Sequence, residues 1–302
     1  MDCDYMVFYI ISPPKNPKSA GSMILYDLKD QFIAAGFDAQ RWLIAQDKDG
    51  IFYISFDEIN FHILNETTIK NNISSHDCVL IHGEGLHYKY FASFNVARFY
   101  LNKIGALKNI GVPRDDEFII RWDKSFVEKS HFDLTKIVVK KSSHEVLDTN
   151  RSRSIDLTYI GKGGLYLKGL ARLSGTLEMT RAWPSSNEEY IFLLSRTRFL
   201  FTYDTVSSVN SDAVYYGAIP VFMTNLPFKS QDEMSSALGE NYPVLFIEEL
   251  NLLLERKRFL EYEDFFNEYR KNFILKADAS EEYYLSQLPV LAENLKSFFG
   301  LS

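Results

Sequence analysis

Apolar runs and segments with helical spacing alternate through the first part of the chain. Residues 6–12 form an apolar run, and a loop rich in proline and lysine follows it as far as Gly21. The next segment has the spacing of a helix that stops at Gly36. Its apolar positions are Met23, Ile24, Leu28, Phe32 and Ile33. Together with a second apolar run at 39–45, this order predicts a right-handed strand-helix-strand unit with parallel strands.

The same alternation continues to residue 140. The pattern indicates a buried parallel strand at 78–82, followed by a Gly-Glu-Gly loop. It also predicts a helix over 90–101, short strands at 118–122 and 136–140, and a strand with a short helix within 53–64. Strands that alternate with helices are typical of a doubly wound sheet.

A polar stretch separates this half from a second alternating series. Residues 141–154 are rich in serine and charged residues and have no apolar periodicity, which predicts an interdomain linker. Strands are then expected at 156–160 and 177–179, a helix at 187–196, and a mostly helical tail at 250–301. The two series predict an α/β protein with two Rossmann-like, doubly wound domains that face one another across a cleft.

The corner formed by residues 199–222 is the most informative local pattern. An apolar strand ends at Asp204, a turn with Ser207 and Ser208 follows, and a short helix closed by Gly217 leads to a second strand. Such a corner places an acid, hydroxyls and free helix N–H groups at the carboxyl edge of a parallel sheet, where open α/β folds bind nucleotides. Asp204 could instead cap the helix, and the two roles are compatible.

Composition excludes several classes of protein. The 302 residues are 46% apolar and 24% charged, and a formal charge of −7 is spread without a block of like charge, which argues against a nucleic-acid surface. Cys3 and Cys78 are far apart and offer no metal-ligand spacing or dense disulfide framework, so a reducing compartment is expected. No run approaches a membrane span or a secretory signal. The cytoplasm is the expected location.

A glycine loop follows the first strand of the second series. Residues 160–164 (Ile-Gly-Lys-Gly-Gly) allow a close approach of backbone or phosphate, and Lys162 supplies a positive charge. A dinucleotide fingerprint would require glycine where the chain has Tyr166, and no Walker sequence is present. The sequence therefore disfavours NAD binding and the commonest kind of ATPase.

Other candidate residues lie near predicted strand ends. His82 and Glu84 come at the end of the strand at 78–82, where a base could take a proton from a bound hydroxyl, although a lone histidine can also be structural. Arg181 could bind a phosphate or a carboxylated sugar, or it could stack on Trp183.

Metal-ligand patterns are weak. The chain has no His-x-x-x-His and no paired cysteines. Asp-x-Asp pairs occur at 2–4, near the chain start, and at 47–49, in a predicted turn, and we interpret both as chance matches. A site that works without a metal or other cofactor is expected.

Three separated segments resemble bacterial GT-B glycosyltransferases of surface-polysaccharide assembly (capsule, O-antigen and lipopolysaccharide). Residues 14–22 (Pro-Lys-Asn-Pro-Lys-Ser-Ala-Gly-Ser) and the helix after them resemble the first acceptor-side loop of that family. Residues 96–105 resemble its Arg-x-x-Leu-Asn-x-x-Gly segment, with Arg98 and Asn102 as the polar members. Residues 202–221 resemble its donor-site motif, in which an acid, serines and an acid-Ala pair precede a Gly-x-x-Pro-Val turn.

The resemblance implies sugar transfer from a nucleotide-sugar to a glycan or lipid-linked acceptor, with the nucleotide-sugar as co-substrate. The N-terminal acceptor-side domain is expected at 1–142, the nucleotide-sugar domain at 155–285, and a last helix at 286–302 that crosses back to the first domain. The apolar stripe of that helix could alternatively contact the inner membrane. The residues expected to bind the donor are Lys162, Gly163, Arg181, Tyr203, Asp204, Ser207, Ser208 and Asp212. The acceptor-side residues are Lys15, Asn16, Lys18 and Ser22, and the candidate bases are His82 and Glu84.

One position departs from the family pattern. The later acid of the donor motif is usually a glutamate that contacts the donor ribose, and here it is Asp212, shorter by one methylene. A ribose contact through a small shift and an exposed helix residue without that role both stay open. A nucleotide-sugar-modifying enzyme such as an epimerase and a non-catalytic ligand-binding relative are the alternative functions.

Overall fold

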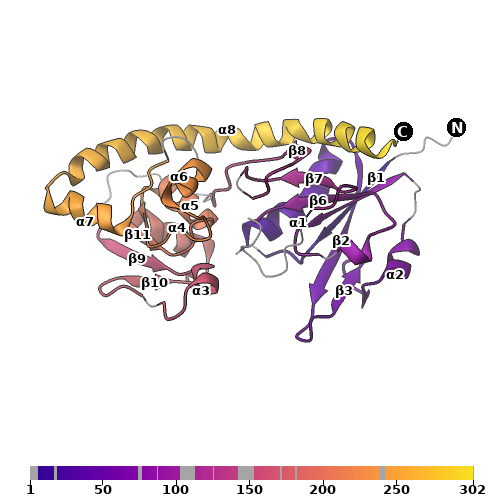
Figure 1. Cartoon of the computed structure of the whole chain (residues 1–302), viewed down its shortest axis with the longest axis horizontal. Helices are drawn as coiled ribbons and strands as arrows, with labels where there is room; N and C mark the ends of the chain where they lie inside the picture. The colour runs from indigo at the N-terminus through magenta and orange to yellow at the C-terminus, as the bar shows by residue number, and fades with distance from the viewer. Residues whose placement is uncertain are drawn as a thin grey trace. The chain divides into compact units, whose positions relative to one another are not determined.

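The chain divides into two compact units, each with a sheet of its own (Figure 1). The computed structural model describes residues 6–16, 19–73, 77–86, 88–102, 113–124, 126–141, 153–170, 172–180, 182–238 and 242–301. Met1–Lys136 and Glu282–Ser302 make up the first unit, and Ile137–Glu281 make up the second. Most of the linker predicted at 141–154 lies outside the described residues.

The first unit is built on an eight-stranded sheet with the order β4-β3-β2-β1-β5-β6-β7-β8. The strands from β2 to β8 in that order are parallel, whereas β3 and β4 form an antiparallel hairpin on β2. Its elements are β1 (Val7–Ser12), α1 (Ala20–Ala34), β2 (Asp38–Gln46), β3 (Phe52–Ser55), β4 (Phe61–Ile63), α2 (Glu66–Lys70), β5 (Cys78–Gly83), η1 (Tyr88–Tyr90), β6 (Val96–Tyr100), β7 (Phe118–Arg121) and β8 (Phe132–Asp133).

Helix α1 packs on one face of this sheet. It begins after Ser19, whose hydroxyl accepts the N–H of Ser22 at 3.4 Å, and Gly36 follows its end with φ of 91°. The ring of Phe32 on α1 lies 4.5 Å from that of Phe8 on β1. The predicted helix is therefore confirmed, with the apolar positions Ile24, Leu28 and Phe32 facing the sheet.

Three predictions for residues 53–140 are wrong, the last of them in part. Residues 90–101 hold the end of η1 and strand β6 instead of a helix, because all five residues of Val96–Tyr100 are buried between β5 and β7. A short run that is buried on both faces has no periodicity that separates a strand from a helix. Residues 136–140 form no strand. Residues 53–64 form the β3–β4 hairpin, and the helix expected among them comes later, as α2.

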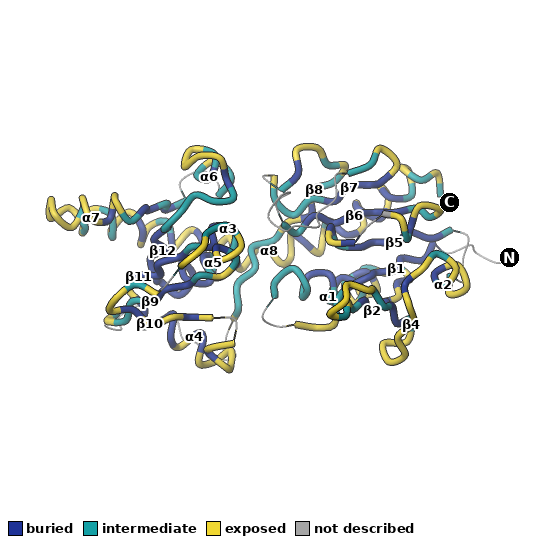
Figure 2. Tube along the Cα trace, turned by 60° about the horizontal axis from the view of Figure 1, so that its bottom comes forward, coloured by how far each residue is buried: buried dark blue, intermediate teal, exposed yellow. Residues whose placement is uncertain are grey.

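The second unit has four parallel strands in the order β10-β9-β11-β12. Its elements are β9 (Ile155–Tyr159), α3 (Gly163–Tyr166), β10 (Leu177–Met179), α4 (Asn187–Arg196), β11 (Thr197–Thr202), α5 (Ser208–Tyr216), β12 (Ile219–Phe222), α6 (Gln231–Leu238), α7 (Ile247–Glu255) and most of α8 (Phe259–Phe299). The α/β class is thus confirmed, with one mainly parallel sheet and one fully parallel sheet. Figure 2 shows that the strands of both sheets are largely buried.

Helix α8 is one element of 41 residues that contributes to both units. In the second unit it packs through Phe266 and Phe273. In the first unit its apolar stripe at Leu288, Leu291 and Leu295 is fully buried. The end of α8 covers the same sheet face as α1, because the strand register places Phe118 on the side of Ile10 and Phe118 contacts Phe298. Within the described residues, no helix is long and apolar enough to span a membrane.

Truncating the buried stripe of α8 tests its contribution to the core. The Leu291→Ala variant removes a fully buried side chain, and we expect the free energy of unfolding to fall by about 2–5 kcal/mol. The adjacent Val290 is 48% exposed, and Val290→Ala should change it by less than about 1 kcal/mol. Urea denaturation followed by circular dichroism measures both, and equal losses in the two variants would contradict the assignment.

Candidate functional site

The strand order gives each sheet one topological switch point. In the second unit the chain passes from β9 to β10 on one side and then to β11 on the other side of β9. In the first unit it passes from β1 to β2 and later to β5 on the other side of β1. Open parallel sheets bind ligands at the carboxyl ends of the strands that flank such a point. The loops after β9, β11, β1 and β5 are therefore the candidate sites, and most of the sequence-predicted residues that the structure describes fall in or near them.

Asp204 joins the two loops at the switch point of the second unit. It lies just beyond the end of β11, is 2% exposed, and accepts the backbone N–H of Lys162 at 2.8 Å through Oδ2. Its own N–H donates to the hydroxyl of Thr202 at 3.1 Å. The carboxylate therefore fixes the position of the loop that carries Lys162.

Glycine is required where these loops touch. A Cβ on Gly161 would lie 2.5 Å from Oδ2 of Asp204, and a Cβ on Gly163 would lie 2.5 Å from the backbone oxygen of Tyr203. Gly161 also has φ of 49°. Contact between two loops thus accounts for both glycines, independently of the phosphate approach that the sequence suggested.

Helix α5 begins at the same corner. Ser207 is its N-cap, with Oγ accepting the N–H of Val209 at 3.3 Å. Asn210, which sequence reasoning missed, donates its side-chain amide to the carbonyls of Asp204 and Thr205 at 2.9 and 3.3 Å. The sequence signal that could have indicated this contact is an asparagine in the first helical turn after a serine N-cap.

This corner also presents a positive helix end at an accessible place. Tyr203, Ser207 and Ser208 are half-buried, and so is Lys162 on the neighbouring loop. The first N–H groups of a helix and its dipole attract anions. Backbone donors and one ammonium group therefore lie near the switch point.

Asp212, the later acid of the donor motif, is buried inside the second unit. It is 1% exposed, and its two oxygens accept the N–H of Lys140 at 2.8 Å and the hydroxyl of Tyr190 at 2.6 Å. Burial raises the pKa of Asp212 to about 6. It is therefore not an exposed helix residue. Both oxygens are held by donors inside the unit, because this position of α5 faces α4 rather than the edge of the sheet.

The predicted acceptor-side residues lie on the loop after β1 and at the start of α1. Lys15 forms an ion pair with Asp27 at 3.8 Å. The backbone oxygen of Asn16 accepts the N–H of Ser19, and the hydroxyl of Ser22 contacts that of Ser19 at 3.1 Å. Lys18 lies outside the described residues, as does Arg181 of the predicted donor set.

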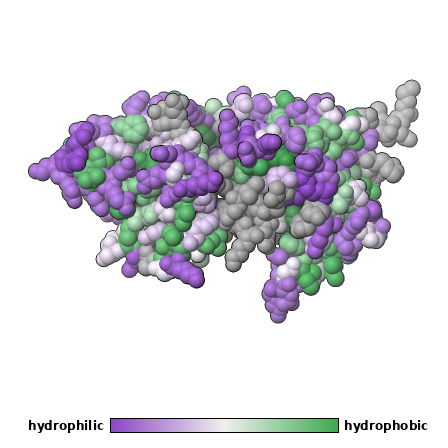
Figure 3. All heavy atoms as spheres, viewed as in Figure 1, coloured by the Kyte–Doolittle hydropathy of each residue, from purple (hydrophilic) through white to green (hydrophobic). Residues whose placement is uncertain are grey.

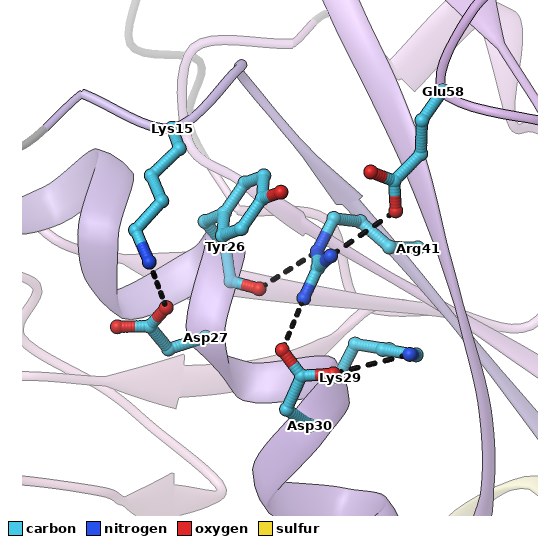
Figure 4. A network of polar contacts seen from close by, with 7 residues as sticks. All are labelled: Lys15, Tyr26, Asp27, Lys29, Asp30, Arg41 and Glu58. Atoms are coloured by element: carbon cyan, nitrogen blue, oxygen red, sulfur yellow. Dashed lines mark hydrogen bonds and ion pairs between the residues drawn. The ribbon is translucent and has the colours of Figure 1, made fainter.

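Arg41 organises the neighbourhood of this loop and was missed from the sequence. Figure 4 shows its guanidinium between α1 and the turn that carries Glu58. Its Nε donates to the carbonyl of Tyr26 at 2.8 Å, and its two Nη atoms donate to Asp30 at 2.6 Å and Glu58 at 3.1 Å. The guanidinium also lies over the Tyr26 ring at 3.8 Å. Strand β2, helix α1 and the β3–β4 turn are thereby tied together beside Lys15.

His82 is enclosed in the core of the first unit. Its Nδ1 lies 2.7 Å from the carbonyl of Gly83, and its ring stacks on Phe91 at 4.8 Å. Burial lowers the pKa of His82 to about 4, so the ring is neutral near pH 7. The carbonyl contact places the proton on Nδ1. The Nε2 atom then accepts no hydrogen bond from the part of the chain that the structure describes.

Glu84 links the carboxyl ends of β5 and β6. Its Oε2 accepts the N–H of Leu101 at 3.0 Å, and its Oε1 accepts the side-chain amide of Asn102 at 2.6 Å. Arg98, the register partner of His82, forms a buried ion pair with Glu117. Of the polar residues of the Arg-x-x-Leu-Asn segment, Asn102 therefore joins the ends of β5 and β6, and Arg98 joins the middle of β6 to the residue before β7.

No arrangement that would hold a metal occurs among the described residues. A search of them for three or more His, Cys, Asp or Glu side chains placed to hold an ion finds none. The Asp47 carboxylate instead accepts the N–H groups of Asp49 and Ile51, each at 2.9 Å, within the β2–β3 turn.

No protein-family model matches the chain, and no curated protein matches it in sequence. Among solved structures it is similar to MurG of Acinetobacter baumannii, with a TM-score of 0.48 and 8% identity over 94% of this chain and 99% of that one. It is also similar to the spinosyn rhamnosyltransferase SpnG, with a TM-score of 0.42 and 9% identity over 95% of this chain and 100% of that one.

A matched pair of glycine variants tests the loop contact. In Gly163→Ala the new Cβ would meet the Tyr203 backbone, and we expect a loss of about 1–3 kcal/mol in the free energy of unfolding. In Gly164→Ala the nearest atom would be Cγ2 of Ile160 at 3.7 Å, an ordinary contact, so stability should hold. Urea titrations of both variants measure the difference, and a Gly163→Ala protein as stable as Gly164→Ala would refute the contact.

The raised pKa of Asp212 predicts a pH dependence of stability. The unfolded carboxyl loses its proton near pH 4 and the folded one near pH 6, so the folded state binds more protons between these values. This residue's contribution to stability therefore falls as pH rises from 4 to 6, by at most about 1.4 kcal/mol per pH unit.

The Asp212→Asn variant removes this titration. The free energy of unfolding of Asp212→Asn minus that of the wild type should rise as pH rises from 4 to 6. Above pH 6 this difference should stay constant. Urea unfolding across pH 4–8 measures the difference, with Asp232→Asn on the exposed side of α6 as the control for a lost charge. Parallel profiles for the wild type and Asp212→Asn would show that burial does not shift this carboxyl.

Proposed function

We propose that the chain is a glycosyltransferase that moves a sugar from a nucleotide-sugar donor to a glycan or lipid-linked acceptor. The observation that carries the proposal is the corner at the switch point of the second unit. There Asp204 holds the Lys162 loop against the strand end from which α5 begins. This is the place where a parallel sheet binds a nucleotide.

The donor diphosphate would bind at the start of α5. The Ser208 end of the helix offers backbone N–H groups and the positive end of the dipole. Lys162 would neutralise charge on the diphosphate as the bond to the sugar breaks, which is the electrostatic stabilisation that such a reaction requires. Asp204, being buried, would act by positioning the Lys162 loop rather than by contacting the sugar.

Catalysis would rest on orientation and on stabilising the leaving diphosphate, without a metal or other cofactor. Of the two candidate bases, Glu84 already accepts two hydrogen bonds and the His82 ring is enclosed in the core. The proton of the acceptor hydroxyl would therefore pass to the departing diphosphate. His82 and Glu84 would then support the strand ends on the acceptor side.

The acceptor would bind at the switch point of the first unit. The loop with Lys15 and Asn16 lies there, and the Arg41 network fixes its surroundings. The resemblance of residues 14–22 to the acceptor loop of surface-polysaccharide transferases supports this assignment. Assembly of a surface polysaccharide in the cytoplasm is the proposed setting.

Donor binding tests the proposal most directly. A panel of nucleoside diphosphates and nucleotide-sugars should raise the melting temperature for one base. In Lys162→Ala, loss of a charged contact should weaken that binding by roughly tenfold to a hundredfold in calorimetric titrations. Lys168→Ala, an exposed lysine of the same loop region, is the control and should bind as the wild type does.

Transfer of a radiolabelled sugar from the matching donor to an acceptor fraction separates the candidate functions. An epimerase would bind the donor and convert it without an acceptor, and a non-catalytic relative would bind it without turnover. Absence of any stabilisation across the panel at millimolar concentration would overturn the proposal.

A further inference from the structure

Two arginine side chains lie at the end of helix α5. Arg270 of α8 donates from Nε to the carbonyl of Tyr215 at 3.0 Å and is 8% exposed. Arg153, two residues before β9, is half-buried, and its guanidinium lies where a Cβ on Gly217 would clash with it. Because α5 leads from the end of β11 to the start of the parallel strand β12, its last turn lies at the amino edge of the sheet. The arginines are therefore at the opposite end of α5 from the Asp204 corner.

The two guanidinium groups are close enough to repel one another. Burial and the charge of Arg153 lower the pKa of Arg270 to about 10, and burial also lowers the pKa of Arg153. Both groups stay charged near pH 7. Among the residues that the structure describes, neither forms an ion pair, and the contact with Tyr215 is their one hydrogen bond. Buried charges and buried N–H groups are costly unless an acceptor compensates them.

The groups around the two arginines compensate this charge only in part. The end of a helix carries roughly half a negative charge, so α5 offsets a small share of it. Glu263, two turns before Arg270 on α8, acts on Arg153 through its charge but forms no ion pair with it. Asp278, two turns after Arg270, is already paired with Lys141 at 2.7 Å. Even with the full charge of Glu263 counted, the surroundings therefore leave a net positive charge.

We propose that Arg153 and Arg270 bind a small, doubly charged oxyanion of the phosphate type at the amino edge of the second sheet. The planar fork of a guanidinium matches the oxygens of a phosphate, and two forks side by side supply both the charge and the donors that such an anion requires. Helix α5 has nine residues, so its two ends are about 13 Å apart. The site is therefore separate from the proposed donor site, and the inference goes beyond the sugar-transfer proposal without resting on it.

Melting temperatures of the full chain in phosphate, sulfate or chloride at equal ionic strength test the site. We expect millimolar phosphate or sulfate to raise the melting temperature above its value in chloride. In Arg153→Gln, loss of a charged contact should weaken phosphate binding by roughly tenfold or more in calorimetric titrations. Circular dichroism verifies that this variant is folded. Glycerol 3-phosphate, used in place of phosphate, shows whether the site takes a phosphate ester as well as the free anion.

A lysine next to Arg270 supplies the matched control. The exposed side of α8 is mainly hydrophilic (Figure 3), and the side chain of Lys271 is 74% exposed. Lys271→Gln should therefore bind phosphate as the wild type does, and its response also corrects for the general stabilisation of proteins by phosphate and sulfate. Glu263→Gln removes the neighbouring negative charge and should bind phosphate more tightly.

Lys162→Ala separates this site from the donor corner. This variant should keep the response to phosphate, because Lys162 lies near the other end of α5. A response that is lost in Lys162→Ala and kept in Arg153→Gln would place the anion at the donor corner and overturn the inference. It is also overturned if phosphate does not stabilise the wild type, if Arg153→Gln and Lys271→Gln respond equally, or if Glu263→Gln binds phosphate more weakly.

Discussion

The contact between the loops that follow β9 and β11 is the constraint on which the candidate site depends. Gly161 and Gly163 allow the two loops to approach closely. The Asp204 carboxylate joins them by accepting the N–H of Lys162. The carbonyl of the same aspartate receives the Asn210 amide from the first turn of α5. One residue therefore sets both the spacing of two strand ends and the start of the helix between β11 and β12.

In the first unit, other residues make the same kind of contact between neighbouring strand ends. Glu84, after β5, accepts the N–H of Leu101 after β6, as Asp204 after β11 accepts that of Lys162 after β9. Neighbouring parallel strands end with unpaired backbone groups, and a buried carboxylate from one loop satisfies those of the next. Polar residues at strand ends can thus stabilise the fold by accepting backbone hydrogen bonds. For this reason, their presence in a sequence is weak evidence for catalysis.

Local signals in the sequence were sufficient for much of the fold and for the location of the candidate loops. The helix at 187–196 was predicted with the bounds it has, because Ser186 caps it and apolar spacing fills it. The end of β11 and the α5 corner were readable from an apolar run that stops at an acid. Strand β6 could not be predicted, because its residues are buried on both faces and so show no alternation of apolar and polar positions. Asp212 and Arg41 could not be placed either, since their partners lie far along the chain: Lys140 is 72 residues from Asp212, and Glu58 is 17 from Arg41.

Helix α8 has a consequence for how this protein is made. Residues at its end, including Tyr284, Leu288 and Phe298, complete the core of a unit whose other members all precede residue 137. During synthesis from the N-terminus, the ribosome must therefore finish the entire second unit before the earlier sheet receives its last covering segment. Until then Phe118 and Trp122 lack their contacts with Phe298 and Tyr284, so the nascent chain exposes aromatic surface of the kind that makes incomplete folds prone to aggregation.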